Sequence, residues 1–198
     1  MLSVDIVVLE LNMDHAFAYL STSGFLGLPI DKTPAHKRYA IAGVNWDGSC
    51  TNRPGARFGP SAIRHASQML CDATHPLFEI SPIEHLQDVG DLALPNTNLD
   101  AMRSALMPQV VDLIKKQTCI WLGGDHSITL PLLRAYHAHY QQPLACIHFD
   151  AHCDTWTDHF GEPSGHGTWV YEAITEGLVD PNCFVPIAIR SAAARTER

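Results

Sequence analysis

The sequence predicts an α/β domain of three layers, α/β/α, built around a mainly parallel sheet. Short apolar runs alternate with amphipathic stretches along the 198 residues, as in chains of strand–helix units. Hydrophobic residues make up 46% of the chain, which is enough for a folded core. The length suits one domain better than two, so we expect one sheet with helices on both of its faces.

Five short apolar runs are the predicted strands. They lie at residues 39–44, 84–89, 118–122, 144–149 and 184–189. Three of them are followed by polar or glycine-bearing loops, which begin at Gly90, Gly123 and Asp150. Because ligands in open α/β sheets bind beyond the carboxyl ends of the strands, we expect the chemistry of this protein in these loops.

Four predicted helices lie between the strands, at residues 61–69, 99–113, 128–140 and 168–176. Asn98 is expected to cap the second helix, whose apolar residues follow a period of 3.6. Pro108 is expected to kink or interrupt that helix, because proline lacks an N–H group and crowds the preceding turn. Gly177 is expected to end the fourth helix.

Composition excludes several classes of protein. The formal net charge is −8 and the basic residues form no cluster, so we expect no nucleic-acid partner. No run of about 20 apolar residues is present, so we expect no membrane span. The apolar stretch near the N-terminus lacks the preceding Lys or Arg of a signal peptide. None of the six cysteines is in CxxC spacing, which favours free thiols in a reducing cytoplasm.

The segment DAHCD at residues 150–154 directly follows the fourth predicted strand. Residues two apart on an extended segment point the same way, about 6.5 Å from each other. We therefore expect Asp150, His152 and Asp154 to converge while Cys153 faces away. Two carboxylates and an imidazole suit Mn²⁺, Fe²⁺ or Zn²⁺. The alternative is a solvated acidic loop that contains a histidine by chance.

The segment WLGGDHS at residues 121–127 is a second cluster at a strand end. Its paired glycines allow positive φ and a close approach of the backbone to a ligand. Asp125 could orient an imidazole from behind. The alternative is an ordinary strand–helix turn that leaves His126 on the surface, but two such clusters at strand ends favour a metal site.

His166 lies between Gly165 and Gly167, with little side-chain bulk to bury it. An exposed, mobile imidazole near a metal centre suits proton transfer, because histidine exchanges protons near neutral pH. The alternative is a histidine at a helix start in a flexible loop. His148, inside the fourth predicted strand, is interpreted as a satisfied core residue.

GGDHS at 123–127, DAHxD at 150–154 and the glycine-flanked histidine at 166 together resemble the ureohydrolases, the family of agmatinase, arginase and guanidinobutyrase. The similarity extends to NRPGARFGP at 52–60, QDVGD at 87–91 and IAIRS at 187–191. The resemblance implies an arginase-like fold and the hydrolysis of a small guanidino compound to urea and an amine by two Mn²⁺ ions. It also implies a homo-oligomer.

The resemblance implies a role for each matching residue. His126 matches a ligand of the first Mn²⁺, and Asp150 matches a carboxylate that bridges both ions. Asp154 matches a ligand of the first ion, and His152 matches a ligand of the second. His166 matches the histidine assigned to proton transfer.

Trp156 bears on the substrate. Arginases carry an asparagine at this position, where it contacts the amino acid end of arginine. Tryptophan there disfavours arginine and favours agmatine, whose hydrolysis yields putrescine for polyamine biosynthesis. An ω-guanidino acid, as in guanidinobutyrase, is the alternative.

The resemblance covers only part of the family's pattern. We expect an N-terminal extension at residues 1–24, a partial ureohydrolase domain at 25–191 and a tail without family character at 192–198. The family's SxDxDxxDPxxxPG segment and a later glutamate that grips the guanidinium do not occur in this sequence. We therefore expect an incomplete second metal site, an exposed apolar sheet edge and, as an alternative to an enzyme, a non-catalytic fragment.

An unrelated metallophosphoesterase would need a GNH[DE] element, which the sequence lacks.

Overall fold

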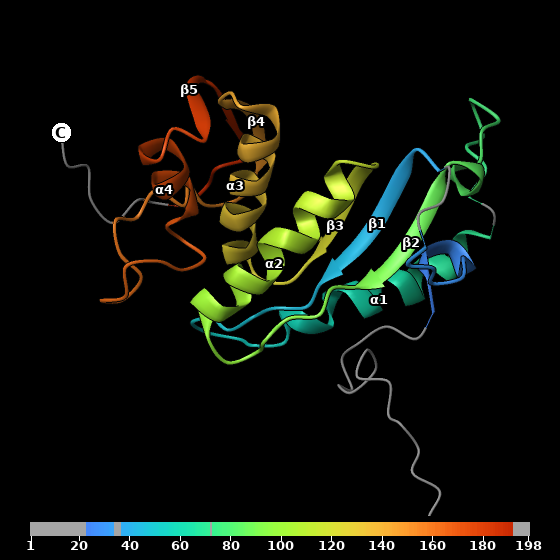
Figure 1. Cartoon of the computed structure of the whole chain (residues 1–198), viewed down its shortest axis with the longest axis horizontal. Helices are drawn as coiled ribbons and strands as arrows, with labels where there is room; N and C mark the ends of the chain where they lie inside the picture. The colour runs from blue at the N-terminus through green and yellow to red at the C-terminus, as the bar shows by residue number, and fades with distance from the viewer. Residues whose placement is uncertain (1–22, 34–36, 72, 192–198) are drawn as a thin grey trace, which may run out of the picture.

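The computed structural model describes residues 23–33, 37–71 and 73–191. Its first sheet contains β1 (Tyr39–Val44), β2 (Leu86–Asp91) and β3 (Thr118–Gly123). All pairs are parallel, and the strand order is β2-β1-β3 (Figure 1). The central strand is the apolar β1, as expected for a strand that is covered on both faces.

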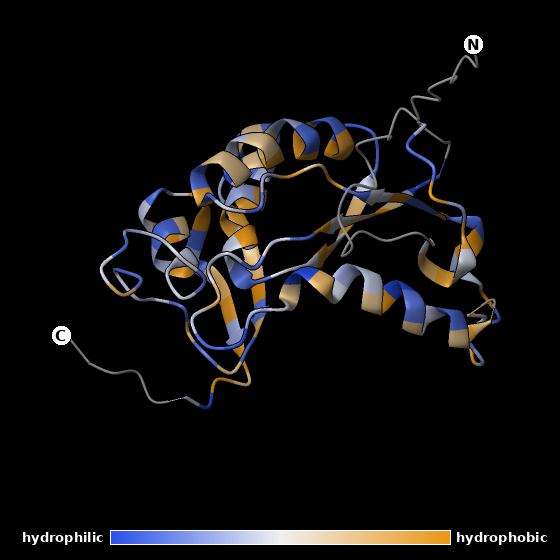
Figure 2. Cartoon of the chain, turned by 90° about the horizontal axis from the view of Figure 1, so that it is seen from below, coloured by the Kyte–Doolittle hydropathy of each residue, from blue (hydrophilic) through white to orange (hydrophobic). Residues whose placement is uncertain are grey.

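Helices cover both faces of this sheet. α1 (Gly59–Ser67) lies on one face, and α2 (Leu99–Ile114) lies on the other, where it packs against α3 (Thr129–Tyr140). Figure 2 shows the strands of the sheet between α1 and α2. The core on the α2 face joins alternate side chains of β1 to the fully buried side chains of α2. They are Ala40, Ala42, Val44, Met102, Leu106 and Val110. The α/β class with parallel strands and layered helices is therefore confirmed.

A second parallel sheet contains β4 (Leu144–Phe149) and β5 (Val179–Ile187). α3 and α4 (Trp169–Thr175) cover one of its faces. The prediction of one continuous sheet is wrong for the part of the chain that the structure describes, because β3 and β4 are not paired there. The crossover through α3 joins β3 to a strand that is not its neighbour, and nothing in a crossover connection requires adjacency.

The predicted element boundaries agree with the structure to different degrees. β1 and β4 have the predicted bounds, and the four helices begin and end within two residues of the predicted positions. β5 begins five residues earlier than predicted, because Val179 already pairs with Leu144. Asn98 caps α2 as predicted, with its Oδ1 accepting the N–H of Ala101 at 2.8 Å.

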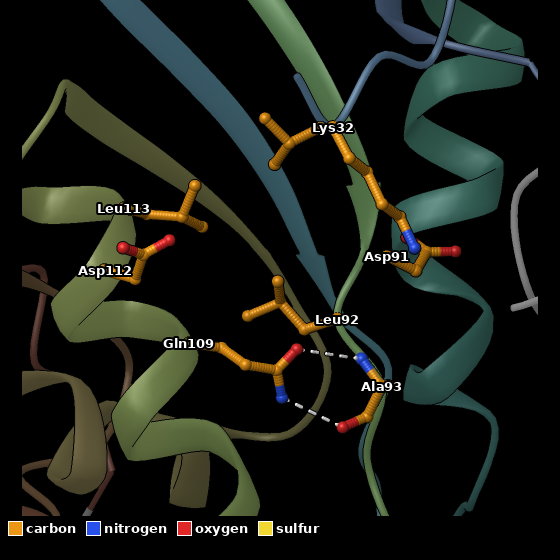
Figure 3. Close-up of a pocket in the computed structure, with 8 residues that line it drawn as sticks. Lys32, Asp91, Leu92, Ala93, Gln109, Asp112 and Leu113 are labelled. Atoms are coloured by element: carbon orange, nitrogen blue, oxygen red, sulfur yellow. Dashed lines mark hydrogen bonds between the residues drawn. The ribbon is translucent and has the colours of Figure 1, made fainter. Parts of the chain in front are cut away.

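Pro108 does not interrupt α2, which runs unbroken from Leu99 to Ile114. The buried side chains on both sides of the proline pack into the same core, and this packing outweighs the loss of one backbone hydrogen bond. The neighbouring Gln109 fastens the helix to the loop after β2. Its side-chain amide donates to the carbonyl of Ala93 at 3.0 Å and accepts the N–H of Ala93 at 3.2 Å (Figure 3).

A buried ion network fixes α1 to the end of β2. The Arg64 guanidinium, 1% exposed, donates to both oxygens of Asp88 at 2.8 and 2.9 Å and to Asp91 at 2.5 Å. Burial alone would lower the pKa of Arg64, but the hydrogen bonds and charges of the two carboxylates outweigh it and raise the pKa. Gly43 is required beside them, because a Cβ atom there would lie 1.9 Å from Asp91 Oδ1.

Among the described residues, no helix is long and apolar enough to cross a membrane.

We expect Arg64→Met to lower the free energy of unfolding by about 3–5 kcal/mol, because it leaves buried carboxylates without a counter-charge. Lys116→Met is the matched control, since Lys116 forms an exposed pair with Asp112 in α2 at 2.7 Å. That substitution should cost less than about 1 kcal/mol. Urea denaturation measures both values, and equal costs for the two variants would contradict the structural weight given to Arg64.

Candidate metal centre

Four side chains gather where the ends of β3 and β4 face each other. His126 begins the short helix η6 (His126–Ile128) after β3, His148 lies near the end of β4, and Asp150 and Asp154 follow β4. One possible ligand atom from each of the four residues lies within 4.8 Å of the other three. We call these four residues the donor cluster.

The distances within the donor cluster are short. His126 Nδ1 lies 2.9 Å from Asp154 Oδ2 and 3.1 Å from Asp150 Oδ2. His148 Nε2 lies 3.3 Å from the same Asp150 oxygen. Carboxylate and imidazole donors at such separations fit a divalent cation of the Mn²⁺, Fe²⁺ or Zn²⁺ class.

The Gly-Gly turn places His126. Gly124 has a φ of +80°, and a Cβ atom there would lie 2.5 Å from the carbonyl oxygen of Val44. The turn therefore passes directly over the end of β1, where the N–H of Asp125 donates to the carbonyl of Trp46 at 2.8 Å. Only glycine permits both this conformation and this approach.

The start of α4 holds Asp154. The indole N–H of Trp169 donates to Asp154 Oδ2 at 2.8 Å, and the N–H of Val170 donates to the backbone carbonyl of Asp154 at 3.1 Å. Asp154 has a φ of +51°, so the chain turns sharply at this residue. The carboxylate is consequently fixed toward His126.

Asp150 is held from two sides. The N–H of His152 donates to Asp150 Oδ1 at 2.9 Å, while Oδ2 faces His126 and His148. Burial alone would raise the pKa of Asp150, but the His152 N–H, the contact with His148 and the charge of His126 outweigh it and lower the pKa. Asp150 is therefore an anion suited to a cation.

His152 is not a member of the donor cluster. Its side chain is 68% exposed, and its Nδ1 lies 3.4 Å from the second oxygen of Asp150. The extended conformation ends at Phe149, so strand alternation does not place His152 with Asp154. Its assignment as a metal ligand beside Asp150 stays a prediction. The fourth member of the donor cluster is His148, which was interpreted from the sequence as a core residue. The same two-residue spacing, applied upstream from Asp150 along the strand, could have found it.

His166 is half-buried and hydrogen-bonded, which corrects the expectation of an exposed imidazole. Its Nδ1 lies 2.6 Å from the carbonyl oxygen of Ser49, and its ring packs edge-on against His159 with a centroid distance of 4.9 Å. Because a carbonyl can only accept, Nδ1 carries the proton and Nε2 of the neutral ring keeps its lone pair. Gly165 leaves the space that the His159 ring fills.

The Asp125 carboxylate orients His166 through Ser49. Its Oδ2 accepts the N–H of Ser49 at 2.9 Å, and the carbonyl of the same Ser49 binds His166. Further hydrogen bonds join the loop that contains His166 to α2 and α4. Arg103 in α2 donates to Ser164 at 2.7 Å, and Ser164 donates in turn to Glu172 in α4 at 2.6 Å.

One pocket connects these groups. It has a volume of about 200 Å³ and is lined by His152, Asp154, His166 and two aromatic side chains, Trp156 and Phe160, among others. We call it the histidine pocket. His166 and Asp154, which belongs to the donor cluster, thus both line the histidine pocket.

Comparison with known proteins agrees with this geometry. Residues 37–198 match the model of the arginase family. The chain is 41% identical over 174 residues to an agmatinase from Neisseria meningitidis, covering 85% of this chain and 56% of that protein. It is 38% identical over 175 residues to a guanidinopropionase from Pseudomonas aeruginosa, covering 85% of this chain and 53% of that one.

The fold comparison agrees as well. The structure of proclavaminate amidino hydrolase from Streptomyces clavuligerus superposes with a TM-score of 0.80 at 33% identity, over 91% of this chain and 60% of that one. The chain thus spans a little over half the length of the relatives that it matches. Because the family model matches residues 37–198, which are most of this chain, the chain belongs to the arginase family.

Proposed function

We propose that this protein is a metal-dependent ureohydrolase that hydrolyses agmatine to urea and putrescine. The observation that carries the proposal is the donor cluster, in which His126, Asp150 and Asp154 meet beside the histidine pocket. The family of hydrolases to which the chain belongs supports the same reaction class. We further propose Mn²⁺ as the cation and the cytoplasm as the compartment, with a homo-oligomer as the assembly.

Each residue has a proposed task. His126, Asp150 and Asp154 hold the first cation, and the Oδ1 side of Asp150 with His152 offers donors toward a second. Bound divalent cations supply an activated water at neutral pH. His166 accepts or returns a proton at Nε2, since its Nδ1 proton is committed to Ser49.

The charge of the histidine pocket favours agmatine. Asp154 and Asp158 both line it, and none of the described residues that line it is Lys or Arg. A substrate that is cationic at both ends suits such a pocket, whereas a carboxylate would face acidic groups without a counter-charge. A guanidino acid is the second candidate, favoured by the similarity to guanidinopropionase.

The metal proposal predicts that Asp150→Asn weakens Mn²⁺ binding by roughly 100-fold or more, beyond the 10–100-fold typical of residues that only support a ligand. Asp158→Asn is the matched control, because Asp158 lines the same pocket but lies outside the donor cluster. Calorimetric titration with Mn²⁺ compares the two variants with the unsubstituted chain. Equal affinities for all three proteins would remove the donor cluster as the metal site.

The substrate proposal predicts that the Mn²⁺-loaded chain binds agmatine about tenfold more tightly than arginine, a difference of about 1.4 kcal/mol. The reason is the absence of a described cation in the histidine pocket for the carboxylate of arginine. Titration with agmatine, 4-guanidinobutyrate and arginine gives the order. Tighter binding of 4-guanidinobutyrate than of agmatine would favour the second candidate instead.

Turnover by the 198-residue chain is expected to be slow. Among the described residues, His152 is the one further metal ligand proposed on the Oδ1 side of Asp150, where the second cation would bind. Hydrolysis by two cations needs more ligands than these two residues at the second site. We expect about one tightly bound Mn²⁺ per chain and slow release of urea from agmatine. Rapid urea release with two Mn²⁺ counted per chain would show that other residues complete the site.

A further inference from the structure

His148 is a polar side chain in an otherwise apolar environment. It is 4% exposed within β4, and its ring lies against the rings of Trp169 and Phe184 at centroid distances of 4.9 and 5.8 Å. Burying an imidazole among such neighbours costs free energy unless its nitrogens form hydrogen bonds. A purely structural role would be filled at lower cost by an apolar ring.

The two ring nitrogens of His148 differ in their surroundings. Nε2 lies 3.3 Å from Asp150 Oδ2, at the long end of the hydrogen-bond range. Nδ1 is buried and has no hydrogen-bond partner among the described residues. With the proton on Nδ1, a lone pair on Nε2 would face a carboxylate and the N–H would have no acceptor. With the proton on Nε2, one hydrogen bond forms and only a lone pair is left without a partner.

We propose that His148 is a positioning residue, which donates its Nε2 proton to Asp150 and so fixes this carboxylate for cation binding. The proposal rests on the proposed metal site. Asp150 is then held by an N–H group on each oxygen, from His148 on Oδ2 and from the backbone of His152 on Oδ1. A carboxylate that is fixed before the cation arrives loses less conformational freedom on binding.

The same features argue against His148 as a direct ligand. A histidine that binds a metal through one nitrogen nearly always donates from the other to a protein group or water. The buried Nδ1 of His148 has no such acceptor among the described residues, and the side chain is 4% exposed, against 34% for His126. His126 is therefore the better placed imidazole for the cation itself.

Two substitutions separate the hydrogen bond from the packing. His148→Phe keeps a ring against Trp169 but removes the donor, and His148→Gln keeps an N–H donor at a similar reach. We expect the Phe variant to bind Mn²⁺ about 10-fold or more weakly and the Gln variant to recover most of the loss. Thermal unfolding of both apo variants confirms that they are folded.

The outcomes are distinct. Unchanged Mn²⁺ affinity in His148→Phe would overturn the proposal. A large loss in both variants, with one histidine nitrogen fewer in the pulsed electron paramagnetic resonance spectrum of bound Mn²⁺, would show a direct ligand instead. Failure of the unsubstituted chain to bind Mn²⁺ would count against the proposed function.

A metal-free measurement tests His148 independently of the proposed function. Nitrogen-15 NMR of the apo protein identifies which ring nitrogen carries the proton. We expect the Nε2–H form, with a signal that shifts in Asp150→Asn. The Nδ1–H form would overturn the proposed hydrogen bond even if the chain binds Mn²⁺.

Discussion

The arrangement of the site depends on the buried carboxylate of Asp125. It is 6% exposed and accepts three hydrogen bonds, from the N–H of Ser49 at 2.9 Å and from the N–H and hydroxyl of Ser127 at 2.9 and 2.5 Å. Hydrogen bonds to a charged group contribute about 1.5–3 kcal/mol each, so this carboxylate firmly joins the loop after β1 to the turn after β3. The next residue in the chain, His126, enters the donor cluster, and the carbonyl of Ser49 orients His166. One acidic side chain thus sets the positions of two histidines with different proposed tasks.

The orientation of Asp150 explains how one carboxylate could serve two positions. Its Oδ2 atom faces His126 and His148, whereas its Oδ1 atom faces His152. This division supports the bridging role that the family resemblance implies for Asp150. It also explains why His152, outside the donor cluster, retains a proposed role toward a second cation. The hydrogen bond proposed for His148 would hinder rotation of the Asp150 carboxylate, so that Oδ2 and Oδ1 would keep their different neighbours.

The sequence was informative where local rules decide the structure and uninformative where distant contacts decide it. The bounds of β1 and β4 and the Asn98 cap follow from apolar runs and capping chemistry, which are local. His152 is exposed beyond the end of β4 at Phe149, where strand alternation no longer applies. The hydrogen bond between His166 and Ser49 joins residues that are 117 positions apart. The sequence motif around His166 does not include Ser49, so local sequence could not predict this bond. Pro108 stays within a continuous helix because tertiary packing outweighs a local preference.

The donor cluster also bears on how the two sheets are held together. His126 follows a strand of the first sheet, and Asp150 and Asp154 follow a strand of the second. The two sheets share no strand pairing among the described residues, and one face of the second sheet exposes Ile147, Phe149 and Val185. Helix packing between α2 and α3 is the main described connection besides the cluster itself. A cation held by His126 and the two carboxylates would therefore cross-link the sheets, and its binding free energy would add to the stability of this arrangement as the cation concentration exceeds the dissociation constant. If the proposed metal site is correct, metal binding would therefore be coupled to the relative placement of the two sheets through the same three side chains.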